Sequence, residues 1–354
     1  MKKTLVAAAV AASFAAPAVS FADVAISGNV IQEFVTDSDD TGTSEDGLVS
    51  AAAVDLVFSV SEDLGNGMSA FAKIHTLRDN GGSGNADQVV GIKGDFGTIV
   101  AGRMEDFSEG KVAAMAAVDS SDKLSIEPNG YHQTGRAEGG LAYVSPSFNG
   151  LTFGIAGYAL PNGSVAASTV AASTDGSVSG VSTSTSVVTY TASTKDADAK
   201  FDATDIMVEY ANGPLLVRVA RETVDGGVYS STAGTPDKET DSIAVSYKLD
   251  NITLVGYAFD VENGKGVAAN DMSGHFLGAK MGMGANTFSV SYMEEDDYNT
   301  STGAKETGTD EAWIVSVDHA LSKRTSLTAA YRSTDDGNST SDKDELAVGI
   351  KHVF

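Results

Sequence analysis

The sequence predicts an all-β fold, a transmembrane antiparallel β-barrel of about sixteen strands, and three observations support it. The chain begins with an export-type segment, most of its length alternates apolar and polar side chains with a period of two, and it ends in a strand with a terminal aromatic residue. After the first segment, no apolar run reaches the roughly eighteen residues that a membrane helix needs. Strands, in which only alternate residues face lipid, would therefore make the crossing.

The N-terminal segment has the three parts of a secretory signal. Lysines follow Met1, an apolar run extends over 4–19, and Ser20-Phe21-Ala22 supplies small residues for cleavage. We expect residues 1–22 to be a cleaved signal peptide and residues 23–354 to form a single barrel domain.

Period-two segments recur along the rest of the chain and predict strands. In one example Val54, Leu56 and Phe58 share a face, while Asp55 and Val57 share the other. The expected strands begin near 24, 49, 68, 87, 98, 138, 151, 203, 214, 240, 252, 273, 286, 311, 325 and 345.

The connections between these strands alternate between short and long. The short turns lie at 94–97, 147–150, 212–213, 250–251 and 284–286, and the long polar stretches at 35–48, 104–137, 161–202, 223–239, 261–272, 294–310 and 333–344. In a barrel of hairpins, this alternation places all short turns at one rim and all long loops at the other. A soluble sandwich or propeller is the alternative, and the two chain ends favour the membrane barrel.

The last strand is suited to lipid contact. Leu346, Val348 and Ile350 fall on one face together with Phe354, whose ring can sit at the membrane–water interface. We expect Phe354 to serve in barrel closure and assembly.

The composition excludes several classes of protein. The net charge of −25 disfavours nucleic acid as a partner, and the absence of cysteine excludes disulfides and thiolate chemistry. Asp37, Asp39 and Asp40 offer hard oxygen ligands for Ca²⁺ in an outer loop, although the cluster lacks EF-hand spacing and solvated acids are the favoured interpretation. No other metal or cofactor is expected, and no catalytic constellation stands out, so an enzyme is not expected.

Four stretches of the chain, taken in order, resemble the general porins of Gram-negative bacteria. They are 63–71, 90–103, 141–151 and 321–327, the last of which leads to the terminal strand. The resemblance implies a bacterial outer-membrane barrel, a homotrimer, a second loop at about 79–86 that lies against a neighbouring subunit, and a third loop at about 104–137 that folds inward and narrows the pore. The long segment 161–202 departs from the pattern, as a large fourth loop or an additional hairpin.

The resemblance also points to residues around the pore constriction. The acidic candidates on the third loop are Glu105, Asp106, Glu109, Asp119, Asp122 and Glu127. The basic candidates for the facing wall are Lys73, His75, Arg103, Arg136, Arg218 and Arg332, of which Arg103 needs a bulge to turn inward. The excess of carboxylates predicts a mild preference for cations.

We therefore expect a general diffusion porin that passes ions and small hydrophilic solutes passively. Two alternatives remain open: a channel specific for one class of solute, and a surface-binding barrel whose pore is incidental. The rings of Trp313, Tyr158, Tyr210, Tyr257, Tyr292 and Tyr331 are expected to anchor the barrel at the membrane interface.

Overall fold

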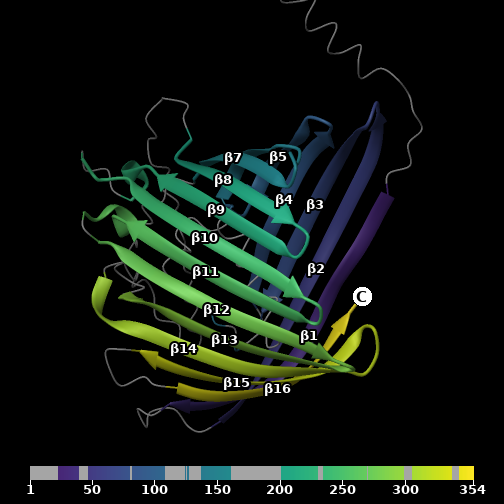
Figure 1. The fold of residues 1–354 in the computed structure, drawn as a ribbon, viewed down its shortest axis with the longest axis vertical. Helices are drawn as coiled ribbons and strands as arrows, with labels where there is room; N and C mark the ends of the chain where they lie inside the picture. The colour runs from purple at the N-terminus through teal and green to yellow at the C-terminus, as the bar shows by residue number, and fades with distance from the viewer. Residues whose placement is uncertain are drawn as a thin grey trace, which may run out of the picture.

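A computed structural model shows a closed antiparallel barrel whose tilted strands follow one another in sequence order (Figure 1). The structure describes residues 23–39, 47–79, 82–107, 124, 126, 137–160, 201–229, 234–268, 270–298, 305–336 and 343–354. Within these ranges the barrel has sixteen strands, the predicted number. Within the same ranges, no helix has the length and apolar character needed to cross a membrane.

Most strands begin within three residues of their predicted starts. Their bounds are β1 Asp23–Asp39, β2 Gly47–Gly65, β3 Met68–Asp79, β4 Gly82–Gly94, β5 Gly97–Met104, β6 Ala137–Val144, β7 Leu151–Ala159, β8 Ala203–Asn212, β9 Leu215–Val224, β10 Lys238–Leu249, β11 Ile252–Glu262, β12 Met272–Met283, β13 Asn286–Tyr298, β14 Lys305–Ala320, β15 Thr325–Asp336 and β16 Lys343–Val353. Two single-turn 3₁₀ helices, η1 (Gly226–Val228) and η2 (Gly264–Gly266), lie in long connections.

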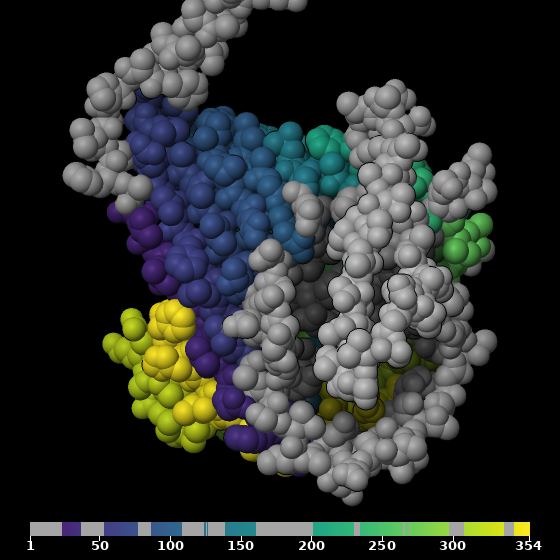
Figure 2. All heavy atoms as spheres, turned by 180° about the vertical axis from the view of Figure 1, so that it is seen from behind, coloured from purple at the N-terminus to yellow at the C-terminus, as the bar shows by residue number. Residues whose placement is uncertain are grey.

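The first and last strands close the barrel. β1 pairs with β16 over eleven residue pairs, from Asn29–Val353 to Asp39–Lys343. Beyond the end of β16, the Phe354 N–H donates to the Gly28 carbonyl at 3.0 Å, and the Gly28 N–H donates to the Phe354 carbonyl at 3.2 Å. The purple N-terminal and yellow C-terminal strands accordingly lie side by side in Figure 2.

Short turns and longer connections alternate as predicted except between β3 and β4, which only residues 80–81 separate. The expected second loop at about 79–86 is therefore mostly strand, because backbone pairing continues to Asp79 and Gly82. At two of the short turns an asparagine adopts positive φ, with 54° at Asn66 and 53° at Asn149, and glycine follows it. An Asn-Gly pair tolerates this left-handed backbone, which a tight hairpin requires. The predicted turn at 147–150 and the turn at Asn66, which was not among the predicted ones, therefore follow from the same residue chemistry.

Side-chain exposure separates the two faces of the barrel wall. On β16 the apolar side chains of Leu346, Val348 and Ile350 are exposed, while Glu345 and Ala347 at the alternate positions are buried. The same alternation holds on β7, where Phe153 and Ile155 are exposed. The exposed apolar face is the one that suits lipid, and the other face lines the inside of the barrel.

Some strands extend further than the apolar pattern predicted. β4 begins at Gly82 rather than near 87, and β14 begins at Lys305 rather than near 311. In the first case the pairing of Arg78 with Ser83 carries the hairpin through a stretch predicted to be loop. Backbone hydrogen bonds can extend a hairpin through polar and small residues, which give no signal in hydropathy.

The predicted long segment 161–202 leaves the strand order intact. β7 pairs directly with β8, from Leu151–Tyr210 to Tyr158–Ala203, so no strand is inserted between them. Residues 161–200 lie outside the described part of the chain.

Candidate pore and constriction

The inner wall of the barrel has two different sides. On β7 to β14 its side chains are mostly buried, as Ala156, Glu222 and Ser291 illustrate. On β2 and β3 the inward side chains of Asp55, Lys73 and His75 are only half-buried. The side formed by β2 and β3 thus keeps more of its inner surface accessible.

The segment that leaves β5 lies against the buried side. The Phe107 N–H donates to Asp205 Oδ2 at 2.5 Å, and Arg218 Nη1 donates to the Phe107 carbonyl at 2.9 Å. The Tyr158 hydroxyl donates to the Glu105 carbonyl at 3.4 Å. Three strands, β7, β8 and β9, therefore hold the start of the predicted constriction loop on the inner wall.

Asp205 is the most enclosed member of this group. Its side chain is fully buried, and the carboxylate of Asp106, itself 5% exposed, lies close enough to act on it electrostatically. Its Oδ2 accepts the bond from Phe107, whereas its Oδ1 is buried without a hydrogen bond. Asp106 is thus buried beside the Asp205 carboxylate on the inner wall.

A second contact between this loop and the wall is apolar. Leu124 and Ile126, 0% and 3% exposed, belong to the same buried cluster as Tyr257, Phe259 and Phe276. Those three rings lie on the inward faces of β11 and β12. Burial of this kind stabilises by about 25 cal/mol per Å² of apolar surface.

Four of the six predicted basic residues of the wall have carboxylate partners. Lys73 bonds to Asp87 at 2.7 Å and His75 contacts Asp55 at 3.2 Å. Arg218 pairs with Glu209 at 2.8 Å, and Arg332 pairs with Glu345. All four lie on the predicted inward parity, and each lies beside a carboxylate of a neighbouring strand.

Parity alone did not reveal these acidic partners. Asp55, Asp87, Glu209 and Glu345 each lie on the inward face of a strand next to one of the cations, and the register brings them together. The sequence did show a carboxylate at inward parity on the strand next to each cation, but not which cation it would stand beside.

Of the remaining predicted site residues, Arg103 lies at a bulge, and several others lie outside the described part of the chain. A register shift between Gly102 and Met104 supplies the bulge that Arg103 required, and Arg103 is half-buried. The predicted residues outside the described part of the chain are Glu109, Asp119, Asp122, Glu127, Arg136 and Asp40. The same holds for the side chains of Asp37 and Asp39, so the calcium hypothesis remains a prediction.

The outward face carries an aromatic cluster next to acidic residues. The rings of Trp313 and Tyr331 lie 5.2 Å apart, and Tyr292 is the partner of Trp313 on β13. The expectation of interface anchoring is wrong for Tyr158 and Tyr257, which are 1% and 3% exposed and face inward. Their strand parity places them on the inward face of the barrel, where the wall packs against the loop.

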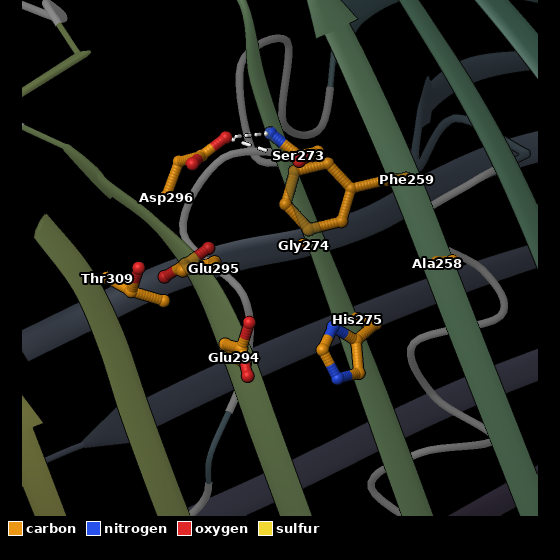
Figure 3. Close-up of a pocket in the computed structure, with 9 residues that line it drawn as sticks. All are labelled: Ala258, Phe259, Ser273, Gly274, His275, Glu294, Glu295, Asp296 and Thr309. Atoms are coloured by element: carbon orange, nitrogen blue, oxygen red, sulfur yellow. Dashed lines mark hydrogen bonds between the residues drawn. The ribbon is translucent and has the colours of Figure 1, made fainter.

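A hollow lies near this cluster, lined by residues of β11, β12, β13 and β14 (Figure 3). Asp296 accepts hydrogen bonds from the Ser273 N–H at 2.8 Å and from its hydroxyl at 3.2 Å. His275 and Glu294 are direct partners across neighbouring strands. Within the described residues, no group of three or more potential ligands is arranged to hold a metal ion.

These features define a class of protein, the membrane-spanning β-barrels with an accessible polar interior. The Gram-negative porin family matches residues 5–339, and the chain belongs to this family. It is a multi-pass β-barrel of the bacterial outer membrane and forms a porin channel. No curated protein matches the sequence.

Solved structures show the same fold at low sequence identity. Salmonella typhi OmpF in complex with daunomycin has a TM-score of 0.66 and 15% identity, over 94% of this chain and 97% of that one. An anion-selective porin from Comamonas acidovorans has a TM-score of 0.62 and 16% identity, over 94% and 100%. The trimer form of Vibrio cholerae OmpT has a TM-score of 0.61 and 10% identity, over 94% and 99%.

Proposed function

We propose that the barrel is a general diffusion channel through which ions and small hydrophilic solutes pass without a dedicated binding site. The observation that carries the proposal is the division of the inner wall. The start of the loop is bonded to β7, β8 and β9, and Leu124 and Ile126 belong to an apolar cluster drawn mainly from β10 to β14. The inward polar side chains of β2 and β3 stay partly accessible. The solute path would then run between the loop and β2 and β3.

Mild cation preference is part of the proposal. The chain carries 48 acidic and 23 basic residues, and the inward cations Lys73, Arg218 and Arg332 each have a carboxylate partner. A water-filled constriction with excess carboxylate raises the local concentration of cations. Three such channels would assemble as a homotrimer, as the trimer form of Vibrio cholerae OmpT suggests. We expect no enzymatic turnover.

Liposome swelling with neutral sugars of increasing size tests the proposal. A general pore gives rates that fall smoothly with solute size and rise in proportion to solute concentration. Saturation by one sugar, with inhibition of the others, would favour a solute-specific channel. Absence of swelling in liposomes that contain folded barrel would favour a surface-binding protein with an incidental pore.

A further inference from the structure

We propose that the contact between His75 and Asp55 on the inner wall sets the charge selectivity of the pore and makes that selectivity depend on pH. This inference rests on the proposed diffusion function. It names the residues that determine which ions pass and the condition that changes their effect.

The two side chains form a partly accessible group on the inner wall. His75 Nε2 lies 3.2 Å from Asp55 Oδ1, with side-chain exposures of 18% and 34%. Asn29 on β1 donates from Nδ2 to Asp55 Oδ2 at 2.8 Å, so both carboxylate oxygens of Asp55 have a partner. The carboxylate is thus held in place while it remains in contact with water.

The neighbouring charges offset one another, so Asp55 and His75 determine the net charge of this part of the wall. On β3 and β4, Lys73 bonds to Asp87 at 2.7 Å, so this cation and this anion offset one another. Asn29 on β1 is uncharged. With neutral His75, the four groups Lys73, His75, Asp55 and Asp87 therefore hold one net negative charge, and a proton on His75 cancels it.

The location of His75 distinguishes it from the other described histidines. His275 lies on the outward face beside the hollow of Figure 3. His319 is exposed at the short-turn rim, bonded to Asn286 at 2.8 Å, and His352 bonds to Thr325 at the same rim at 2.9 Å. Among the described residues, only His75 places an imidazole on the inner wall, and imidazole charge ordinarily changes between about pH 5 and 8.

The test measures reversal potentials of the purified full-length porin in planar bilayers under a potassium chloride gradient, at about pH 8 and about pH 5. In the wild type, the cation-to-anion permeability ratio should fall about twofold on acidification. His75→Gln should remove most of this fall. His319→Gln, which removes a histidine at the rim, should show the same fall in the permeability ratio as the wild type.

A second variant tests the anionic partner. Asp55→Asn should lower the permeability ratio at about pH 8 to near the acid value of the wild type. The inference fails if the permeability ratio of His75→Gln falls on acidification as in the wild type, or if Asp55→Asn keeps the wild-type ratio at about pH 8. Either result would leave the diffusion function intact. If the folded wild type does not conduct at all, both the inference and the diffusion function fail.

Discussion

Asp205 and Phe107 lie 98 residues apart in the sequence and are joined by a hydrogen bond from the Phe107 N–H to Asp205 Oδ2. The acceptor belongs to a wall strand and the donor to the segment that leaves β5. The Phe107 ring also lies against this wall, since a Cβ added to Gly154 would approach its Cζ to 2.7 Å. The backbone of the chain at Phe107 is therefore bound directly to the barrel wall.

Removal of this contact should loosen the start of the loop. We expect Asp205→Ala to increase the open-channel current noise, because the Phe107 N–H loses its acceptor while the barrel retains its strand pairing. Single-channel recording measures the effect. Asp205→Asn, which keeps a carbonyl oxygen at that position, is the control and should resemble the wild type; equal noise in all three proteins would contradict the anchoring role.

The apolar contact of the loop gives a second prediction. A carboxylate at residue 124 would be buried in the apolar cluster that includes Tyr257, Phe259 and Phe276, which costs several kcal/mol. We therefore expect Leu124→Asp to release the loop and raise the single-channel conductance. Leu321→Asp, at a leucine that is 55% exposed on the short-turn rim, should leave conductance unchanged. Unchanged conductance in Leu124→Asp would show that this contact does not shape the pore.

A buried ion pair joins β9 to β10 on the inner wall. Lys238 Nζ lies 3.0 Å from Glu222 Oε2, and the two side chains are 0% and 2% exposed. We expect Lys238→Met to lower the free energy of unfolding by about 3 kcal/mol, since it removes the cation and leaves the buried carboxylate. Urea unfolding in detergent measures this, and the double variant Lys238→Met/Glu222→Gln should recover part of the loss. A single variant as stable as the wild type would contradict the prediction.

The closing contact between Gly28 and Phe354 should control assembly. A Cβ at Gly28 would lie 2.1 Å from the Asp55 carbonyl oxygen and 3.1 Å from Phe354 Cζ. Gly28→Val should therefore reduce the yield of folded barrel, and so should deletion of Phe354, which removes two backbone hydrogen bonds. Electrophoresis of unheated samples separates folded from unfolded barrel. Gly284→Val, at a turn glycine with no atom near its Cβ position, controls for loss of a glycine and should cost less, although its φ of 60° adds local strain.

The sequence predicted the barrel well because its signals are local. Alternation along a strand such as 346–350 and turns such as Asn149-Gly150 depend only on nearby residues, and they determined the strand number and the two rims. Strand ends in polar segments, such as the start of β4 at Gly82, were missed because backbone pairing there leaves no pattern in hydropathy.

The inner wall was predicted less completely because its chemistry depends on register. Parity placed Lys73 and Arg332 inward, but their pairing with Asp87 and Glu345 follows from which strand residues stand opposite. Tyr257 was assigned to the membrane interface because an aromatic ring suits both lipid and a packed interior. Only its place in the buried cluster with Leu124 and Ile126 shows that the Tyr257 ring faces the interior and not the lipid.

Single-channel recording of the purified protein in a planar bilayer distinguishes an open diffusion porin from a barrel that does not conduct. We expect ohmic conductance that appears in steps of three and a reversal potential under a salt gradient that favours cations. A folded barrel that inserts into the bilayer without any conductance would contradict this expectation.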